Sequence, residues 1–334
     1  MRIVFFEVEE WEKEFLQTHL QEHELSFVKD PLTQSNILEF YDSEILSVMI
    51  YSQLRAELLE KIPSLRYITT RSTGFDHIDL EYCKKKNILV SNVPTYGART
   101  VAEHTFALIL ALSHKIIESV ERTRRGDFSL KGLRGVDLCG KTIGVIGLGN
   151  IGRAVIDIAY GFGMRVLVNT KTPDLEYAKQ HDVAFVSLEE LLSQSDVISL
   201  HIPYTPQTQH FINKENIQKC KPGSILINTA RGGVVETEAI LYGLDHAILA
   251  GAGLDVLEEE CFVKEETQLL TEEFLKECNI KTQLLNHVLL TKPNVIITPH
   301  NAFNSKEALQ RILDVTVNNI VQFVNHTPQN LVTQ

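Results

Sequence analysis

The chain has 334 residues, 44% of them hydrophobic, and a formal net charge of −11. This length predicts about two domains with large cores. The acidic balance, without a dense Lys/Arg run, argues against a nucleic-acid partner. No apolar run approaches the ~20 residues of a membrane helix, and the short apolar start is typical of a strand rather than of a signal peptide. The five cysteines are scattered without a CxxC pair. We therefore expect a soluble cytoplasmic protein with reduced thiols and no membrane partner.

The first part of the chain alternates short apolar strands with helices. Strands are predicted at Arg2–Phe6, Leu25–Val28, Ser47–Tyr51, Leu65–Thr70 and Ile88–Asn92. Helices are predicted at Val8–Leu20, Leu54–Lys61 and Leu80–Lys86. Apolar strands joined by crossover helices indicate a parallel sheet that is covered on both faces.

A long helix is predicted next, at about Val101–Val120. It begins with the apolar run Phe106–Leu112. A helix that is apolar on nearly every face must be buried against something large. The pattern leaves open whether this is an interdomain helix or a subunit contact.

A second alternating series begins near residue 141. Its strands are predicted at Lys141–Ile146, Arg165–Val168, Val197–Leu200, Ile225–Asn228, Gly251–Val256 and Val295–Thr298. Ser187 and Glu190 form a capping-box pattern that starts a helix at Leu188. Six strands with intervening helices fit a doubly wound dinucleotide fold.

A last helix near Lys306–Asn325 can return to the first domain. The predicted fold class is therefore α/β, with two Rossmann-like doubly wound parallel-sheet domains and a cleft between them. Residues 1–100 plus 300–334 would form the substrate domain, and residues 101–299 the dinucleotide-binding domain.

The segment Gly147–Gly152 fits the pattern GxGxxG between a predicted strand and a predicted helix. Gly147 permits the tight turn, Gly149 lets a pyrophosphate approach the backbone, and Gly152 lets helix and strand pack closely. The N-terminus of the following helix stabilises phosphate charge. This context predicts a dinucleotide site.

The end of the second strand of this series lacks the acid that usually holds the ribose 2′-hydroxyl of NAD. Thr170 and Lys171 stand there instead. A hydroxyl and a cation suit the 2′-phosphate of NADP, but a relaxed ribose site that uses NAD through other contacts is an equal alternative.

Polar residues follow three further strands. Arg231 suits a substrate carboxylate because its planar fork binds carboxylates bidentately and stays charged. His300 suits proton transfer near neutrality, because reducing a carbonyl needs a proton besides the hydride. The acidic run Asp255–Glu260 lies between them in sequence and offers a carboxylate to keep the histidine protonated. Each residue alone could be structural, and together they indicate a catalytic site without a metal.

Together with the glycine motif, the segments TARGG, GLDVxEEE and TPHNAF resemble the D-isomer-specific 2-hydroxyacid dehydrogenases, most of all their D-lactate dehydrogenase branch. The resemblance implies that Arg231 binds the substrate carboxylate and carbonyl, and that His300 is the acid/base, held by Glu260. It further implies two sets of binding residues. The cofactor set comprises Gly147, Gly149, Asn150, Ile151, Gly152, Thr170, Lys171, Ile202, Pro203, Thr208, Thr229, Ala230 and Asp255. The substrate set comprises Tyr51, Thr73, Gly74, Tyr96, Arg231 and Phe303.

The expected activity is hydride transfer between NAD or NADP and a small 2-oxo acid, with pyruvate to D-lactate preferred. A broader glyoxylate or hydroxypyruvate reductase is the nearest alternative. A dinucleotide-sensing interaction protein without catalysis is an alternative of another class. The expected assembly is a homodimer formed through the helix of residues 101–120.

Overall fold

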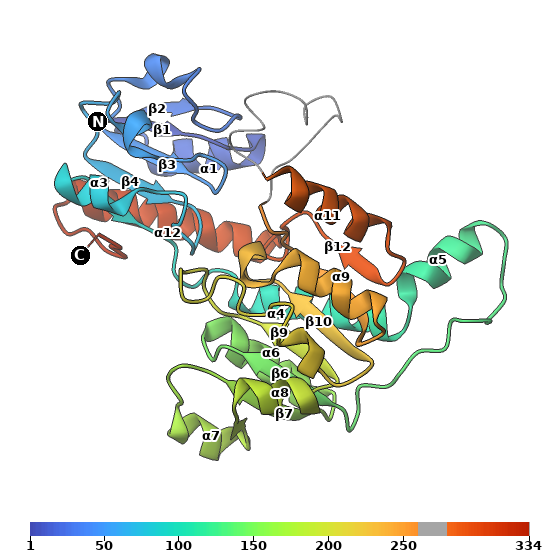
Figure 1. The fold of residues 1–334 in the computed structure, drawn as a ribbon. Coiled ribbons are helices and arrows are strands. Elements are labelled where there is room, and N and C mark those ends of the chain that lie inside the picture. The colour runs from blue at the N-terminus through green and yellow to red at the C-terminus, as the bar shows by residue number, and fades with distance from the viewer. Residues whose placement is uncertain (260–278, 334) are drawn as a thin grey trace. The chain divides into compact units, whose positions relative to one another are not determined.

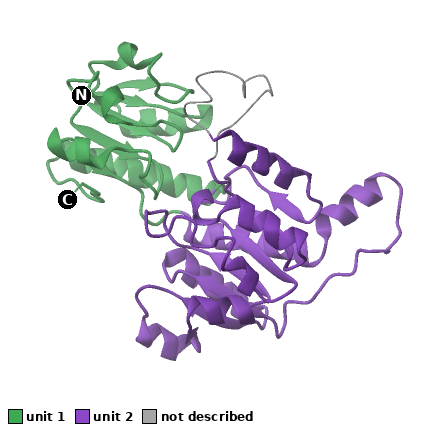
Figure 2. Cartoon of the chain, in the orientation of Figure 1, with its two compact units in different colours: residues 1–96, 304–334 green, residues 97–303 purple. Residues whose placement is uncertain are grey.

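A computed structural model describes residues 1–259 and 279–333. The chain divides into two compact units, which Figure 2 shows in different colours. Unit 1 is Met1–Tyr96 with Asn304–Gln334, and unit 2 is Gly97–Phe303. These boundaries differ by four residues from those predicted at 100/101 and 299/300. The predicted acid Glu260 lies outside the described residues.

Unit 1 is built on a parallel sheet of five strands in the order β2-β1-β3-β4-β5 (Figure 1). Its strands are β1 (Arg2–Phe5), β2 (Glu24–Phe27), β3 (Ile45–Val48), β4 (Tyr67–Thr70) and β5 (Leu89–Ser91). The strand predicted at Ser47–Tyr51 is thus wrong in position, because the chain leaves the sheet after Val48. All five strands were predicted, and they form the expected parallel sheet.

Helices cover both faces of this sheet, because its side chains alternate between two apolar clusters. Ile3 and Tyr67 face α1 and the long α12, whereas Val4 and Ile68 face the shorter helices. The helices of unit 1 are α1 (Glu10–His19), η1 (Ile37–Phe40), α2 (Ala56–Leu59), α3 (Leu80–Lys85) and α12 (Lys306–Val324). The rings of Tyr67 and Phe323 stack with centroids 4.2 Å apart, which fixes α12 to the sheet.

Unit 2 contains a parallel sheet in the order β12-β11-β10-β9-β6-β7-β8, the doubly wound order of dinucleotide-binding folds extended by one edge strand. Its strands are β6 (Thr142–Ile146), β7 (Arg165–Asn169), β8 (Ala184–Phe185), β9 (Val197–Leu200), β10 (Ser224–Asn228), β11 (Leu249–Leu254) and β12 (Val295–Ile297). Strand β8 was not predicted, since two residues are too few for a periodic pattern.

Two helical layers enclose the sheet of unit 2. One apolar cluster joins it to α4 and α6, and the other joins it to α8, α9 and α11. The helices of unit 2 are α4 (Ala98–Ser113), α5 (Ile116–Arg124), α6 (Asn150–Gly161), α7 (Leu175–His181), α8 (Leu188–Gln194), η2 (Ile217–Lys219), η3 (Gly232–Val234), α9 (Thr237–Asp245) and α11 (Ile280–Thr291). Ser187 caps α8 as predicted, since its side chain accepts a hydrogen bond from the Glu190 amide.

The single helix predicted at Val101–Val120 is wrong. Helix α4 ends at Ser113, and Lys115 adopts the left-handed conformation at φ 53° before α5 begins. Helix α4 is buried within unit 2 against α6 and β11. Helix α5 and the segment after it extend away from the rest of unit 2 as an arm (Figure 1).

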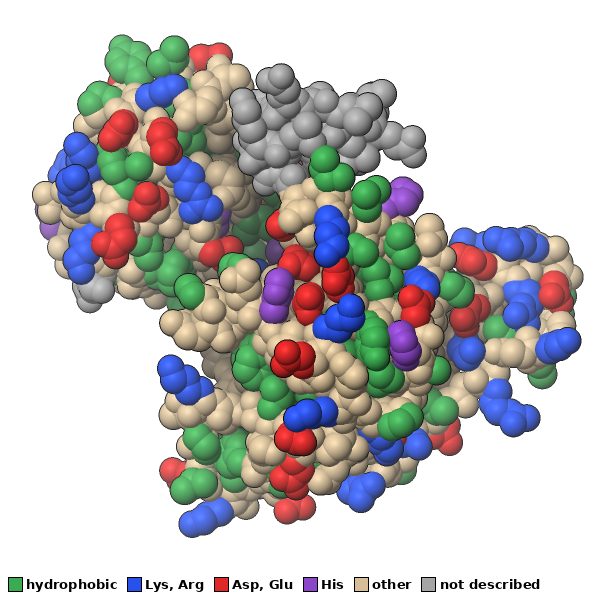
Figure 3. All heavy atoms as spheres, in the orientation of Figure 1, with side chains coloured by type: hydrophobic (Ala, Val, Ile, Leu, Met, Phe, Trp, Pro, Cys, Tyr) green, Lys and Arg blue, Asp and Glu red, His purple; other side chains and the backbone are tan. Residues whose placement is uncertain are grey.

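The surface carries mixed charge. On the face drawn in Figure 3, acidic and basic side chains are interspersed over both units. Among the described residues, no helix is long and apolar enough to cross a membrane. In the same part of the chain, no group of three or more His, Cys, Asp or Glu side chains could hold a metal ion.

Candidate active site

The glycine turn between β6 and α6 has the geometry that a bound pyrophosphate requires. Gly147 adopts φ +102°, and a Cβ on it would lie 2.5 Å from the carbonyl oxygen of His201. A Cβ on Gly152 would lie 2.1 Å from the carbonyl oxygen of Gly147, so helix and turn meet only because both are glycines. Gly149, the N-cap of α6, has open space where a Cβ would stand and offers no capping side chain. The first amides of α6 can therefore face an anion, with Asn150 and Ile151 in the first turn.

The end of β7 carries the cofactor candidates Thr170 and Lys171. Thr170 is half-buried and Lys171 is exposed. The neighbouring cation Arg153 binds the Asp174 carboxylate at 2.8 Å. This hydrogen bond holds the pKa of Asp174 below its ordinary value. Among the described residues, Lys171 forms no ion pair with a carboxylate.

The loop after β9 is held by its own side chains. The Thr208 hydroxyl donates to the Pro203 carbonyl at 2.6 Å and accepts the Thr205 amide at 2.8 Å. Ile202 lies beside the glycine turn, since its Cγ2 would lie 2.8 Å from a Cβ on Gly147. The three predicted loop residues Ile202, Pro203 and Thr208 thus follow the strand adjacent to β6.

Asn228, the last residue of β10, organises the turn that carries Arg231. Its amide nitrogen donates to the Arg231 carbonyl at 2.9 Å, and its amide oxygen accepts the Ala230 backbone N–H at 3.0 Å. The Thr229 hydroxyl is 3.0 Å from that of Thr105 on α4. Arg231 is half-buried, and its Nη1 donates to the Ala230 carbonyl at 2.8 Å. The turn approaches the chain after β11 so closely that Gly232 has no room for a Cβ, which would lie 1.7 Å from the Leu257 oxygen.

The buried Asp255 carboxylate shapes the loop that carries His300. It accepts the backbone amides of Asn301 and Ala302, each at 2.9 Å, and the Thr298 hydroxyl at 2.5 Å. The His300 amide donates to the Asp255 carbonyl at 2.9 Å. His300 itself adopts φ +52°, a conformation uncommon outside glycine. Asp255, which the resemblance assigns to the cofactor, therefore also positions the candidate acid/base.

Sequence reasoning did not single out His104, which completes this network from α4. Its Nε2 lies 3.1 Å from the Thr298 hydroxyl and 3.5 Å from the Asp255 carboxylate. Asn228 and Thr105 were not predicted either. No local motif marks these side chains. The contacts of His104 and Thr105 join segments that are distant in the sequence, and those of Asn228 lie within a single turn.

Glu258, two residues before the predicted Glu260 in the acidic run, makes structural contacts. One of its carboxylate oxygens lies 2.5 Å from His210 Nε2. The other accepts the backbone amide and the hydroxyl of Thr237 at 2.9 and 2.8 Å. Glu258 thus joins the loop after β9 to the start of α9.

The substrate-side candidates gather at the carboxyl edge of the sheet in unit 1. Tyr51 follows β3 with 47% of its surface exposed, and Thr73 and Gly74 follow β4. The Thr73 hydroxyl donates to the Val93 carbonyl at 2.8 Å, and the Asn92 side chain donates to the Thr73 carbonyl at 2.7 Å. These bonds connect the ends of β4 and β5.

Tyr96 and Phe303 lie on the two sides of the division between the units. Arg311 on α12 donates to the Tyr96 carbonyl at 2.7 Å within unit 1. The predicted site residues thus form two groups. Tyr51, Thr73, Gly74 and Tyr96 belong to unit 1, whereas Arg231, Asp255, His300, Phe303 and the cofactor candidates belong to unit 2.

Comparison with known proteins identifies the family. The sequence model of the "D-isomer specific 2-hydroxyacid dehydrogenase, NAD binding domain" matches residues 106–302. A 2-hydroxyacid dehydrogenase homolog of Zymomonas mobilis is 35% identical over 320 residues, which covers 93% of each chain. A glyoxylate reductase of Thermococcus onnurineus is 33% identical over 98% of this chain and 90% of its own.

Among solved structures, D-lactate dehydrogenase from Aquifex aeolicus, complexed with NAD and lactic acid, is similar with a TM-score of 0.88 and 38% identity. The similarity covers 99% of both chains. The chain therefore belongs to the D-isomer-specific 2-hydroxyacid dehydrogenase family and contains its NAD-binding domain. The predicted family and the predicted pair of parallel-sheet α/β domains are confirmed.

Proposed function

We propose that this dehydrogenase reduces pyruvate to D-lactate, with Arg231 and His300 acting on the substrate. The observation that carries the proposal is the arrangement of unit 2. Arg231, Asp255 and His300 follow the adjacent strands β10, β11 and β12, at the same sheet edge as the glycine turn. Ligand-binding groups in parallel sheets gather at this edge.

Each side chain has a separate task in the proposed reaction. The Arg231 guanidinium binds the substrate carboxylate through its planar fork and polarises the adjacent carbonyl. The protonated His300 imidazole donates its proton to the carbonyl oxygen as that oxygen gains negative charge. Glu260 would keep the imidazole charged. The bound nicotinamide cofactor supplies the hydride. The Asp255 carboxylate holds the His300 loop in place.

All but one of the other substrate-side residues belong to unit 1 in this proposal, and Phe303 belongs to unit 2. The backbone amides of Thr73 and Gly74 would bind the substrate carboxylate, and Tyr51, Tyr96 and Phe303 would surround its side chain. The similarity to the D-lactate dehydrogenase of Aquifex aeolicus supports pyruvate as the preferred acid. The glyoxylate reductase among the relatives supports the broader 2-oxo acid reading as a second candidate.

The cofactor could be NAD or NADP, and Thr170 with Lys171 favours acceptance of NADP. The absence of a carboxylate at the end of β7 removes repulsion against a 2′-phosphate, which carries about −1.5 to −2 charges. The exposed ammonium of Lys171 adds attraction there.

Steady-state kinetics with pyruvate, glyoxylate and hydroxypyruvate, each with NADH and NADPH, tests the function. We expect turnover with all three acids and the largest kcat/KM for pyruvate. A larger value for glyoxylate or hydroxypyruvate would favour the second candidate. Cofactor binding without turnover of any 2-oxo acid would favour a dinucleotide-sensing protein. Chiral analysis of the lactate formed checks the D-configuration.

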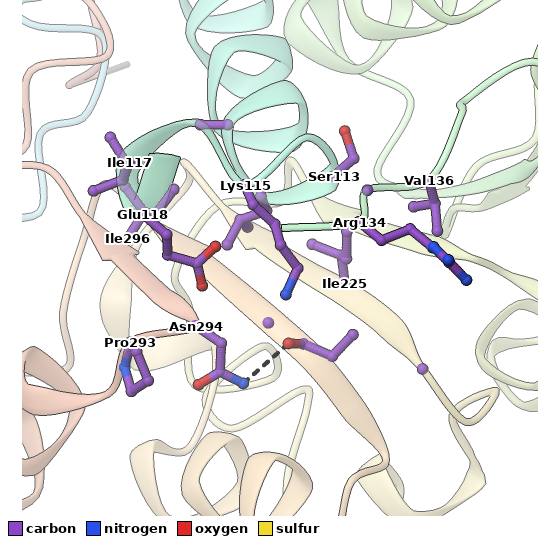
Figure 4. A pocket seen from close by; sticks show the side chains of 16 residues that line it. Ser113, Lys115, Ile117, Glu118, Arg134, Val136, Ile225, Pro293, Asn294 and Ile296 are labelled. Carbon is purple, nitrogen blue, oxygen red and sulfur yellow. Dashed lines mark hydrogen bonds between the residues drawn. The ribbon is translucent and has the colours of Figure 1, made fainter. Parts of the chain in front are cut away.

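A homodimer remains our proposal for the assembly, with the contact surface extended beyond residues 101–120. The apolar residues of α4 are largely buried in unit 2, whereas the arm after it exposes large apolar side chains among its charged ones. Phe128 and Leu130 on the arm are 78% and 84% exposed. Beside the arm lies a pocket of about 190 Å³ at the amino ends of β10, β11 and β12. Figure 4 shows Lys115 and Glu118, at the start of the arm, extending over it.

Sedimentation velocity tests the dimer. A variant with Phe128→Ser and Leu130→Ser should shift the parent from dimer toward monomer, because two exposed apolar anchors are lost from the interface. Leu38→Ser, at a site 70% exposed in unit 1, is the control and should leave the dimer intact. A monomeric parent would contradict the proposal.

A further inference from the structure

A buried guanidinium and a half-buried carboxylate lie at the carboxyl edge of the sheet in unit 1. Arg71, which follows β4, is fully buried, and Glu7 follows β1 at φ +58°, with β3 between these two strands. Arg71 Nη2 donates to the carbonyls of Phe6 and Glu7 at 2.6 and 2.8 Å, and Nη1 donates to the Ser47 hydroxyl at 3.0 Å. One guanidinium thus joins the ends of β1, β3 and β4, where the strands leave the sheet.

The Glu7 carboxylate faces the chain that carries Tyr51. Oε2 accepts the Met49 amide at 2.6 Å and the Ser52 hydroxyl at 3.1 Å, and Oε1 accepts the Tyr51 amide at 2.7 Å. Ser52 in turn accepts the Leu32 amide at 3.0 Å. Within these contacts, Glu7 is the side chain that fixes the backbone of Tyr51, whereas the Tyr51 side chain is exposed.

We propose that ionised Glu7 is a positioning residue that holds Tyr51 in the place where it contacts the 2-oxo acid. This inference rests on the proposed function. Two hydrogen bonds from backbone amides to a carboxylate fix the direction of the loop far better than one bond to a neutral acceptor would. Loss of the charge would weaken the hold on the Tyr51 backbone amide without touching the reacting atoms. The effect should therefore fall on the KM of the oxo acid and spare kcat.

Acid should produce the same effect in the parent protein. Burial is the largest influence on Glu7 and raises its pKa above the ordinary value of 4.5, although Arg71 and three hydrogen bonds oppose it. The charged groups that face Glu7 are Arg71 from the end of β4 and, through Arg71, Glu12 on α1, whose carboxylate lies 3.9 Å from Arg71 Nε. As the pH falls through the raised pKa, Glu7 gains a proton, and the proton displaces one of the amide donors.

The kinetic test compares Glu7→Gln with Glu10→Gln, which alters an exposed glutamate of the same segment. Glu7→Gln should raise the KM of pyruvate about tenfold and change kcat less than twofold, with the KM of NADH unchanged, since about 1.4 kcal/mol of substrate binding corresponds to one decade. Glu10→Gln should match the parent. In a Tyr51→Ala background, Glu7→Gln should change the KM less than twofold. An equal increase in both backgrounds would overturn the proposal.

A second measurement, hydrogen exchange, does not depend on enzymatic activity. Hydrogen exchange of the peptide that covers residues 49–52 should be faster in Glu7→Gln than in Glu10→Gln, because glutamine keeps one acceptor oxygen and one of the two backbone hydrogen bonds is lost. Equal exchange would overturn the proposal. A parent that reduces no 2-oxo acid, but in which Glu7→Gln accelerates this exchange, would contradict the proposed function and retain Glu7 as the residue that holds Tyr51.

The parent protein supplies the test if Glu7→Gln does not fold. The KM of pyruvate should rise as the pH falls through the raised pKa of Glu7, and this acid limb should disappear in Tyr51→Ala, whose substituted side chain is exposed. Protonation of His300 favours reduction and cannot produce such a limb. A limb that persists unchanged in Tyr51→Ala would overturn the proposal.

Discussion

The Asp255 carboxylate and the Ala302 backbone amide form a hydrogen bond of 2.9 Å at the base of the loop that carries His300. Asp255 is 2% exposed, and its other oxygen accepts the amide of Asn301. The groups around this carboxylate are all donors, so both of its oxygens are needed as acceptors. An asparagine side chain has only one acceptor oxygen and cannot replace them both.

We predict that Asp255→Asn lowers both stability and turnover. The new NH₂ group would face backbone donors, and an unsatisfied buried donor costs about 1–3 kcal/mol. The displaced His300 loop should lower kcat/KM at least tenfold. Urea unfolding and pyruvate kinetics measure the two effects. Asp245→Asn, which removes an acid paired with Lys292 at the surface, is the control. Equal stability of the two variants would contradict the role of Asp255.

His300→Asn should retain the fold and lose the reaction. Asparagine accepts the left-handed conformation that His300 adopts more readily than most residues do. Positioned acid catalysis contributes roughly 10²–10⁴ to the rate, so kcat should fall by that factor. NADH binding, followed by fluorescence, should stay unchanged. Turnover near that of the parent would remove His300 from the proposed mechanism.

Lys171→Ala should weaken the use of NADPH and leave the use of NADH nearly unchanged. A hydrogen bond to a charged group contributes about 1.5–3 kcal/mol, although salt screens an exposed site. We therefore expect about a tenfold loss in kcat/KM for NADPH at low salt. Lys179→Ala, on the exposed surface of α7, is the control. Thr170→Asp should favour NADH, and a parent that already rejects NADPH would contradict the proposal.

His201 should make the protein sensitive to mild acid. Burial lowers the pKa of His201 from 6.5 to about 3. The unfolded chain therefore binds a proton that the folded chain excludes, and stability is lost as the pH falls from 6.5 toward 3. Between about pH 7 and pH 5, this lowers the free energy of unfolding by about 2 kcal/mol.

Urea unfolding of the parent and of His201→Gln at both pH values measures this contribution. The loss between the two pH values should be smaller by about 2 kcal/mol in His201→Gln. His246→Gln, at an exposed histidine, should behave like the parent. The same loss in all three proteins would show that His201 does not account for the acid sensitivity.

The sequence was informative where a residue follows a strong strand. Arg231 and His300 could be placed at one sheet edge because apolar runs precede both and parallel strands end together. The break at Lys115 could not be predicted, since apolar periodicity continues on both sides and the left-handed turn is a single residue. Arg71 gave no signal either. A charged residue is expected at the surface. The burial of Arg71 depends on the acceptors that the fold brings to it, which are the carbonyls of Phe6 and Glu7, the Ser47 hydroxyl and the Glu12 carboxylate.

The exact ends of strands and the contacts between residues distant in sequence also could not be predicted. The strand predicted at Ser47–Tyr51 ends at Val48, because the loop after it is held by Glu7, which lies 42 residues earlier than Met49. His104 reaches Thr298 across 194 residues of sequence. Such contacts depend on the packed fold, which a pattern of neighbouring residues does not contain.

Unit 1 is assembled from both ends of this chain. The Asn319 side chain on α12 donates to the Asn92 carbonyl across 227 residues of sequence, and the Val332 amide donates to the Val90 carbonyl. During translation, residues 1–96 leave the ribosome long before α12 has been synthesised. Until then, one face of their sheet lacks the long helix that covers it. Unit 2 is a single stretch of the sequence, so it can fold in that interval. Contacts so distant in sequence also slow folding through the entropy of loop closure. The nascent substrate-side unit is thus the segment most exposed to aggregation, and chaperone binding during synthesis should concentrate on its uncovered strands.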